Sequence, residues 1–451
     1  MHSSEVLQLL RKFESPNITA MEPDGSWPIV WERARGAHVW DADGRKYVDL
    51  TAAFGVAAAG HANRRVIAAG QRQLARLPHA MGDVHPHARK AELARELSRV
   101  TFERWSKSPE KPGVTGRSDA NSSRGRTIFC NSGFEAVEAA LKTAMLASGK
   151  RGVIAFTGAY HGLGYGALDA THRDFFRAPF AKQLGGFTYF VKFPEQASAQ
   201  RAKSAQQTKL DSTERSIRRL FERHAIGAVL VEPVQGRGGM RVPPVSLLPL
   251  LRQLCDEHQA LLVLDEIYTG FGRTGKWFAC EHSNTVPDLI CLGKAMAGGF
   301  PISACVGKAA VMEAAWPRSQ GEALHTSTFL GHPVGCAMAL AQIEEIRSRD
   351  LPARSAELGA FLLQQLASLK APSSVRPKAR GLGLMAGLEL CLPDGSPASR
   401  EAMDIVKSML GAGFILLPEG EHGNVLGFTP PLTIERRLLA QAIEQLGRCL
   451  E

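Results

Sequence analysis

From about residue 127 onward, short apolar runs alternate with amphipathic stretches, and this alternation constrains the fold of the chain more than any other feature. The pattern is typical of a sheet with helices packed on its faces. The predicted strands cover residues 127–130, 153–156, 228–231, 261–264, 289–292 and 302–306. The full length of 451 residues leaves room for about two or three domains. We therefore expect an α/β protein that contains one large sheet domain.

The two ends of the chain have a different pattern. Residues 38–50 predict a β-hairpin, since two apolar runs flank the turn dipeptide Asp43-Gly44. A long amphipathic helix is expected over residues 334–347, and further helices and strands follow it. These later elements favour a separate, smaller α+β unit.

Positive charge exceeds negative charge, with 54 Lys and Arg against 44 Asp and Glu and a net charge of +10. Residues 104–126 and 194–219 hold much of this excess and are rich in polar residues. A surface for single-stranded nucleic acid would interleave aromatic with basic residues, and neither segment does so. We interpret both segments as solvated insertions and expect no nucleic-acid partner.

Neither the N-terminal residues nor the cysteine pattern favours an exported or membrane protein. The N-terminal residues lack a clean apolar core followed by a small-residue cleavage site, and no apolar run reaches the ~18–20 residues that span a bilayer. The 8 cysteines include no CxxC pair, which favours reduced thiols over disulfides or zinc clusters. His79, His85 and His87 lack a matching set of metal ligands. We expect a cytoplasmic protein with no membrane partner and no bound metal.

Four positions each suit one part of a cofactor that carries a phosphate and a cationic aromatic ring. A helix is predicted to begin at Asn131, Ser132 and Gly133, where free N–H groups would bind a phosphate, although a plain helix cap gives the same pattern. Tyr160 and His161 follow a predicted strand, so that a planar cofactor could stack on Tyr160. The alternative is an aromatic residue that covers the edge of the core.

The other two positions carry the charges that such a cofactor needs. Asp265 ends the apolar run 261–264, where a carboxylate is costly unless a cation such as a protonated pyridine nitrogen meets it. A structural aspartate that caps the next loop would give the same pattern. Lys294 lies among glycines and apolar residues, which favours its neutral, nucleophilic form. A solvated surface lysine is the alternative.

Residues 261–307, which begin LLVLDEIYTGFGRTG and end LGKAMAGGFPISACVG, resemble the signature region of the class III aminotransferases that use pyridoxal 5'-phosphate (PLP). This group includes ornithine, acetylornithine and 4-aminobutyrate aminotransferases. Further matching segments are VWDADGRKYVDL, AAGH, NSGFEAVEAAL, FTGAYHG, VEPVQGRGG, TSTFLGHPVGCAMAL and FTPPLTI, which extend the resemblance over nearly the whole chain. The resemblance implies fold type I, with a large, mostly parallel seven-stranded sheet flanked by helices. It also implies a smaller α+β domain from both chain ends, residues 1–60 and 334–451, beside a large domain of residues 61–333.

The resemblance implies catalytic roles for two residues. Lys294 would hold PLP as a Schiff base and move the proton during transamination, and Asp265 would keep the pyridine nitrogen protonated. Tyr160 and Ile267 would pack on the two faces of the cofactor ring.

The resemblance also implies a phosphate site and a shared active site. The residues expected to hold the phosphate are Ser132, Gly133 and Phe134, joined by Thr328 from the second subunit of a homodimer. His161 and Glu232 match positions near the cofactor or substrate.

One departure from the family pattern bears on the substrate. Relatives that use glutamate place an arginine just before the PPL segment, where it binds a substrate carboxylate, and here Gly427 takes that position. The missing arginine favours a donor whose amine is remote from an α-carboxylate, or that lacks one. Glu232 would then be free to meet a substrate cation. By resemblance, Phe54 lies in a segment that forms the substrate pocket.

We therefore predict a PLP-dependent transamination that converts an omega-amine or other non-glutamate donor to an aldehyde or keto product, with a keto acceptor as the second substrate. A PLP-dependent racemase, epimerase or aminomutase would use the same residues and is the alternative. A PLP-binding protein without catalytic activity is disfavoured by the presence of both Lys294 and Asp265.

Overall fold

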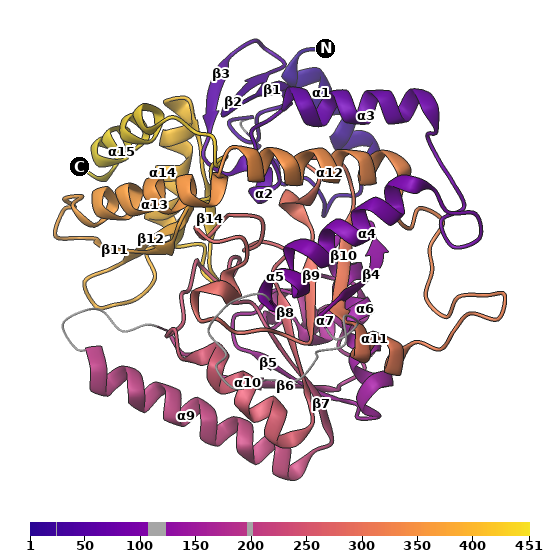
Figure 1. The fold of residues 1–451 in the computed structure, drawn as a ribbon. Coiled ribbons are helices and arrows are strands. Elements are labelled where there is room, and N and C mark those ends of the chain that lie inside the picture. The colour runs from indigo at the N-terminus through magenta and orange to yellow at the C-terminus, as the bar shows by residue number, and fades with distance from the viewer. Residues whose placement is uncertain (24, 107–122, 196–201) are drawn as a thin grey trace.

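The centre of the molecule is a seven-stranded sheet with the strand order β4-β10-β9-β8-β7-β5-β6 (Figure 1). The computed structural model describes all residues except 24, 107–122 and 196–201. The strands are β4 (Gly125–Cys130), β5 (Gly152–Phe156), β6 (Thr188–Val191), β7 (Ile226–Val231), β8 (Leu261–Asp265), β9 (Leu289–Leu292) and β10 (Ser303–Lys308). β10 is antiparallel to β4 and β9, and the other neighbours are parallel. The expected α/β class is confirmed, and every predicted strand of this sheet is present.

Both faces of the sheet are buried, because successive residues of a strand point to opposite sides. In β8, Val263 belongs to one hydrophobic cluster, while Leu262 and Leu264 belong to another. Helix α6 (Gly133–Ser148) packs in the first cluster and α10 (Leu247–His258) in the second. The apolar runs that predicted the strands therefore reflect burial on two sides.

Further helices surround the sheets (Figure 1). They are α1 (Ser3–Phe13), α2 (Ala52–Gly55), α3 (Arg64–Arg76), α4 (Ala88–Val100), α5 (Phe102–Ser106), α7 (Tyr165–Ala170), α8 (Asp174–Arg177), α9 (Ala202–Arg223), α11 (Ala309–Ala315), α12 (Pro333–Ser348), α13 (Leu351–Ala367), α14 (Ser399–Gly411) and α15 (Arg436–Leu450). The short 3-10 helices are η1 (Ala178–Phe180), η3 (Ala279–His282) and η4 (Lys294–Met296). Within the described residues, every helix is too short or too polar to cross a bilayer.

Helix α9 corrects the prediction of a solvated insertion over residues 194–219. Leu210, Thr213 and Ile217 are buried at helical spacing. The helix contacts α10 and the edge strand β6. The many polar residues between these three hid the stripe, and β6 was missed because most of its residues are only partly buried. The other predicted insertion, 104–126, lies mostly outside the described residues.

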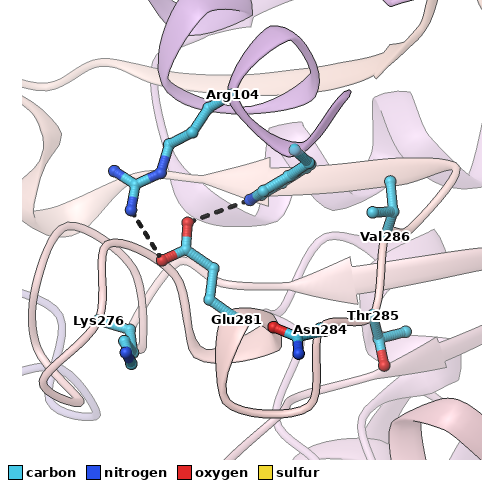
Figure 2. Close-up of a pocket in the computed structure, with 7 residues that line it drawn as sticks. Arg104, Lys276, Glu281, Asn284, Thr285 and Val286 are labelled. Atoms are coloured by element: carbon cyan, nitrogen blue, oxygen red, sulfur yellow. Dashed lines mark hydrogen bonds and ion pairs between the residues drawn. The ribbon is translucent and has the colours of Figure 1, made fainter. Parts of the chain in front are cut away.

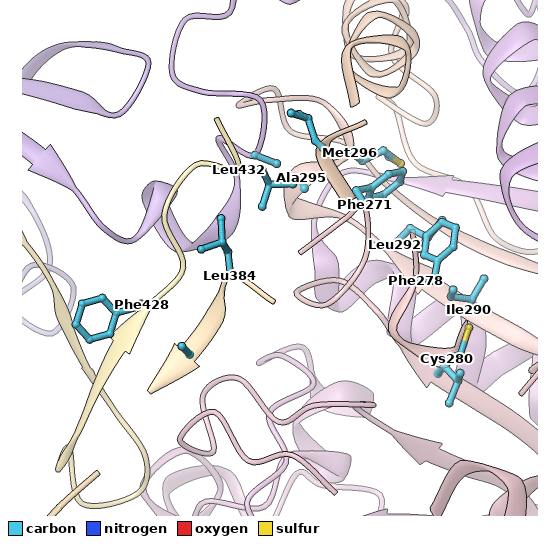
Figure 3. Packing of buried hydrophobic residues seen from close by; sticks show 14 of the residues in the cluster. Phe271, Phe278, Cys280, Ile290, Leu292, Ala295, Met296, Leu384, Phe428 and Leu432 are labelled. Atoms are coloured by element: carbon cyan, nitrogen blue, oxygen red, sulfur yellow. The ribbon is translucent and has the colours of Figure 1, made fainter. Parts of the chain in front are cut away.

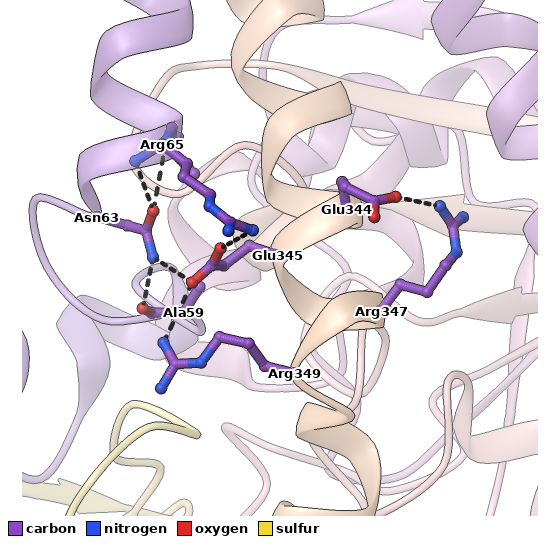
Figure 4. Close-up of polar contacts among 8 residues, drawn as sticks. Ala59, Asn63, Arg65, Glu344, Glu345, Arg347 and Arg349 are labelled. Carbon is purple, nitrogen blue, oxygen red and sulfur yellow. Dashed lines mark hydrogen bonds and ion pairs between the residues drawn. The ribbon is translucent and has the colours of Figure 1, made fainter.

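Helix α12 confirms the helix predicted over residues 334–347, but it is mostly buried rather than amphipathic. It packs against α3 and α4. Its buried Glu345 accepts hydrogen bonds from Asn63 at 3.1 Å and Arg349 at 3.2 Å and pairs with Arg65 at 3.4 Å (Figure 4). These contacts join the start of α3 to α12.

Two smaller, four-stranded sheets complete the fold. One of them combines strands from the N-terminal region with a strand from the C-terminal region. Its order is β1-β2-β3-β13, with β1 (Trp31–Arg35), β2 (His38–Asp41), β3 (Lys46–Asp49) and β13 (Phe414–Ile415). The β2/β3 antiparallel pair confirms the predicted hairpin, and β13 runs parallel to β3. The second sheet has the order β11-β12-β15-β14, with β11 (Arg376–Leu382), β12 (Met385–Cys391), β14 (Leu417–Glu419) and β15 (Val425–Phe428).

Apolar packing connects this second small sheet to the main one. Phe271 and Phe278 lie in the loop after β8, and Met296 lies just after β9 (Figure 3). All three are buried in one cluster with Leu384 and Leu432 of the C-terminal region. The loops at this end of the main sheet are therefore held between two layers.

Candidate active site

Four predicted site residues lie at the same edge of the main sheet. The parallel strands β9, β8, β7 and β5 are neighbours, and each ends just before or at one of these residues. They are Lys294, Asp265, Glu232 and Tyr160. Because ligands of open α/β sheets bind at the carboxyl ends of parallel strands, this edge is the candidate active site.

Asp265 is held in one orientation by two contacts. Its Oδ2 lies 2.8 Å from Nδ1 of His161, and its Oδ1 accepts a hydrogen bond from the backbone N–H of Ile267 at 3.1 Å. The His161 side chain is fully buried, and its Nε2 has no hydrogen-bond partner among the described residues. His161 therefore positions the carboxylate that the sequence singled out.

Lys294 lies two residues after the end of β9, in a left-handed backbone conformation with φ of 34°. Its Nζ is 4.3 Å from the ring centroid of Tyr268. Burial lowers the pKa of Lys294, although the charges of Asp265 and Glu232 act in the opposite direction. A lowered pKa favours the neutral amine, which is the form that acts as a nucleophile.

Tyr268 is a site residue that the sequence analysis missed. A Cβ on either Gly55 or Gly236 would overlap its ring, so these two glycines make room for it. Its hydroxyl is 3.1 Å from Oγ1 of Thr429. Its position three residues after Asp265 could have suggested that Tyr268 lies near the site. Its contact with Lys294, however, is visible only in the structure.

The start of α6 has the features of an anion site. Glu135 accepts a hydrogen bond from the backbone N–H of Ser132 at 2.9 Å. The N–H groups of Gly133 and Phe134 belong to the first turn, where a helix supplies no carbonyl partner. The buried Ser132 Oγ also has no hydrogen-bond partner among the described residues. A Cβ on Gly133 would lie 3.2 Å from Cδ1 of Ile267, which follows Asp265 by two residues. The first turn of α6 therefore lies close to the end of β8.

Glu232 is held by the loop around it. One carboxylate oxygen accepts a hydrogen bond from the backbone N–H of Tyr160 at 3.0 Å, and the other from that of Gly236 at 3.1 Å. Burial raises the pKa of Glu232 to about 7, against the effect of His161. These two contacts fix the orientation of the carboxylate, and its expected contact with a substrate cation stays a prediction.

Phe54 lies in a left-handed turn that contacts the segment of Lys294. Residues 52–55 have φ values of 47°, 49°, 62° and 78°, a conformation that costs about 1–2 kcal/mol for each residue with a side chain. Asp49 stabilises the turn by accepting hydrogen bonds from the N–H groups of Thr51 and Ala53 at 2.8 and 3.1 Å. The α2 segment contacts η4, and Phe54 is 51% exposed. Strain of this kind is typical of functional sites.

Gly427 adjoins Glu419, which pairs with Arg237, and the sequence analysis identified neither of these charged residues. A Cβ at residue 427 would be 2.8 Å from Cγ of Glu419. Nη1 of Arg237 lies 3.6 Å from Oε2 of Glu419. Burial raises the pKa of Glu419 to about 7, against the charge of Arg237. Arg237 belongs to the VEPVQGRGG segment, whereas no sequence motif marked Glu419.

Thr328 is exposed and lies in a loop beside the start of α6. Within the same chain, Nδ2 of Asn131 donates a hydrogen bond at 3.3 Å to Oγ of Ser327, the residue before Thr328. Its predicted role across a subunit boundary stays a prediction.

His87, one of the three histidines considered as metal ligands, has an ordinary structural contact. Nδ1 of His87 accepts a hydrogen bond from the N–H of Lys90 at 3.2 Å and so caps α4. The part of the chain that the structure describes contains no group of three or more side chains suited to hold a metal.

A separate pocket of about 360 Å³ contains none of the site residues (Figure 2). In it, Glu281 accepts hydrogen bonds from Trp105 at 3.1 Å and Arg104 at 3.3 Å. These contacts attach α5 to η3.

Comparison with known proteins identifies similar sequences over nearly the whole chain. The family model for class III aminotransferases matches residues 20–450. The chain is 35% identical over 428 residues to the 5-aminovalerate aminotransferase DavT of Pseudomonas aeruginosa, covering 94% of both chains. It is 36% identical over 455 residues to the putrescine aminotransferase of Pectobacterium atrosepticum, covering 98% of this chain and 88% of the relative.

Solved structures of transaminases have the same fold. An amine transaminase from an uncultivated Pseudomonas species, solved in its PLP-bound form, matches with a TM-score of 0.84 and 27% identity, covering 97% of this chain and 98% of that one. An (S)-enantioselective omega-transaminase from Thermomicrobium roseum matches with a TM-score of 0.87 and 25% identity, covering 100% and 98%.

Proposed function

The chain belongs to the class III aminotransferases, a PLP-dependent enzyme family, and we propose that it transfers the amino group of an omega-amine donor to a keto acceptor. The observation that carries this proposal is the position of Lys294 and Asp265 at the ends of the adjacent strands β9 and β8. The choice of donor is supported by Gly427, which provides no side chain to bind a glutamate carboxylate.

The residues of the site fit PLP. Ser132 Oγ and the N–H groups of Gly133 and Phe134 provide unsatisfied donors for a phosphate at a helix N-terminus. The carboxylate of Asp265 would meet the cationic ring nitrogen. When bound, PLP supplies an aldehyde that reacts with amines and a ring that withdraws electrons from the adjacent carbon.

The side chains around the cofactor site have distinct proposed roles. Lys294 would accept and return the proton at its Nζ, a role that suits an amine with a lowered pKa. His161 would keep the Asp265 carboxylate in place through its 2.8 Å contact. Tyr160 and Ile267 would restrict the ring from its two faces.

The proposed donor carries its reactive amine away from any α-carboxylate. The relatives quoted above are named for 5-aminovalerate and putrescine, which both meet this description. Phe54 would line the donor site, because its strained turn contacts the segment of Lys294. Glu232 would stabilise the loop that carries Tyr160.

We propose that the active enzyme is a homodimer in which Thr328 reaches the phosphate site of the partner subunit. The exposed apolar side chains of Phe329, Leu324 and Met81 support a covered surface near Thr328. Mixed dimers of Lys294→Ala and Thr328→Ala subunits test this arrangement, since a residue that acts across the boundary leaves one intact site. Equal inactivity of mixed and parental dimers would mean that Thr328 acts within its own chain.

The division into domains is also a proposal. A small domain of residues 1–60 and 334–451 is supported by the pairing of β13 with β3, and a large domain of 61–333 by the seven-stranded sheet. The cytoplasmic location expected from the sequence stays a prediction.

The function is tested with a panel of amino donors added to the PLP-loaded enzyme. Transamination predicts a change in cofactor absorbance together with release of an aldehyde or ketone. Inversion of a chiral amino acid without a keto product would instead indicate a racemase, and the absence of any spectral response would contradict catalysis.

A further inference from the structure

Glu419 places a buried carboxylate beside the proposed donor site. It ends β14 and pairs with Val425 of β15, so that Gly427, two residues further on, faces the same side of the sheet. A Cβ on Gly427 would lie 2.8 Å from Cγ of Glu419. The absence of a side chain at residue 427 therefore gives Glu419 the space it occupies.

This carboxylate lacks a full partner. Glu419 is 3% exposed, and its Oε2 has no hydrogen-bond partner among the described residues. The guanidinium of Arg237 lies 3.6 Å away, which is longer than a hydrogen bond. The Arg237 side chain is 34% exposed and can move into solvent, whereas Glu419 cannot. Burial of a charge with so weak a partner is unfavourable, so a better-placed cation would be bound.

Apolar side chains connect this carboxylate to the reactive amine. Nζ of Lys294 lies over the ring of Tyr268, and Tyr268 packs in one buried cluster with Met240 and Met385. Cε of Met240 would lie 3.3 Å from the same Cβ position that meets Glu419. Lys294 and Glu419 are also close enough for each charge to affect the pKa of the other. A methylene chain with an amine at each end matches this sequence of contacts.

We propose that Glu419 binds the distal ammonium group of an aliphatic diamine donor, and that this ammonium displaces Arg237. The inference rests on the proposed function and specifies its substrate class. The exchange replaces one cation by another, so the carboxylate stays neutralised while Arg237 turns to solvent. A monoamine of the same length makes no such contact. An omega-amino acid would bring its carboxylate toward Glu419 and is disfavoured unless Arg237 remains.

The test compares 1,4-diaminobutane with 1-aminobutane in the donor half-reaction of the PLP-loaded enzyme, followed by cofactor absorbance. Glu419→Gln keeps the shape of the side chain and removes its charge. We expect its kcat/KM for the diamine to fall roughly 10- to 100-fold through a higher KM, as for the loss of a charged hydrogen bond. The monoamine should change little. Glu421→Gln is the matched control, since Glu421 is exposed and lies two residues further on.

Binding without turnover gives a second measurement. Calorimetry on the borohydride-reduced holoenzyme should show a higher Kd for 1,4-diaminobutane in Glu419→Gln than in the wild type or Glu421→Gln. Arg237→Met removes the competing cation and should lower the diamine KM, which gives an independent result if Glu419→Gln folds poorly.

Three outcomes would overturn the inference. Equal losses for diamine and monoamine would show a structural role for Glu419, and no loss for either would show that it does not contact the donor. A wild-type preference for 5-aminovalerate over the diamine would assign recognition to Arg237 instead. Failure of every amine to change the wild-type cofactor spectrum would contradict the proposed function itself.

Discussion

Replacing Gly427 by arginine would restore the side chain that binds carboxylates in glutamate-using relatives, but the structure predicts that this change alone is destabilising. The new Cβ would lie 2.8 Å from Cγ of Glu419 and 3.3 Å from Cε of Met240. Both neighbours are buried, so neither can move into solvent. Overpacking of this kind costs about 1–3 kcal/mol. We expect Gly427→Arg to lose that much stability and to gain little with 2-oxoglutarate.

The double variant Glu419→Ala with Gly427→Arg separates the crowding from the missing charge. Alanine at residue 419 removes the Cγ that the new side chain would meet, so the two changes should be coupled by about 1 kcal/mol or more. The arginine would then be able to pair with the acceptor carboxylate. A charged hydrogen bond contributes about 1.5–3 kcal/mol, which corresponds to roughly a 10-fold or greater gain in kcat/KM for 2-oxoglutarate.

Urea denaturation of the wild type, both single variants and the double variant measures the coupling, and steady-state kinetics measure the gain. Gly411→Arg is the matched control, because a Cβ at Gly411 would meet no atom within 4 Å. It should be about as stable as the wild type, since exposed substitutions usually change stability by less than ~0.5 kcal/mol. The reasoning is refuted if Gly427→Arg is as stable as the control, or if the two changes are simply additive.

Three further predictions concern catalysis. Lys294→Ala should abolish the covalent fixation of PLP by borohydride, and mass spectrometry that still finds the cofactor attached would contradict the assignment. Asp265→Ala should keep its fold by circular dichroism while its turnover falls by about 100-fold or more, as for loss of a preorganised charge; near-normal turnover would refute its role. Burial raises the pKa of Glu419 to about 7 against the charges of Arg237, Lys294 and Arg173. Because the carboxyl group is neutral below its pKa, the KM for 1,4-diaminobutane should fall as the pH rises through about 7. If Glu419→Gln shows the same dependence of KM on pH as the wild type, this prediction is wrong.

The central strands of the main sheet were predictable because they are apolar on both faces, whereas the edge strand β6 is only partly buried and was missed. All residues of β7, Ile226–Val231, are buried, and a run of this kind stands out in any window. The positions of Lys294 and Asp265 at strand ends were predictable for the same reason, because each residue follows or ends such an apolar run. Helix α9 was not predictable in this way, because its buried stripe of Leu210 and Ile217 is spaced among charged residues.

The charges around the proposed donor site could not be predicted from the sequence. Glu419 owes its position to the register of β14 and β15, which sets it beside Gly427. Arg237 approaches it from the loop after β7, far away in the chain. Tyr268 is similar, because its contact with Lys294 depends on how two neighbouring strands end. Side chains that meet only through long-range pairing leave no periodic signal in the sequence.

The pairing of β13 with β3 can form only after almost the whole chain has been synthesised. β3 is complete at residue 49, but its parallel partner is not made until residue 415. At roughly 5–20 residues per second, the ribosome takes about 20 to 70 s to cover that interval. Throughout that time the outer edge of β3 has no strand to pair with, and the strained turn at Phe54 follows directly after it. We therefore expect the proposed donor site to close late in folding, so that a chain released early would complete much of its large sheet and still bind no substrate.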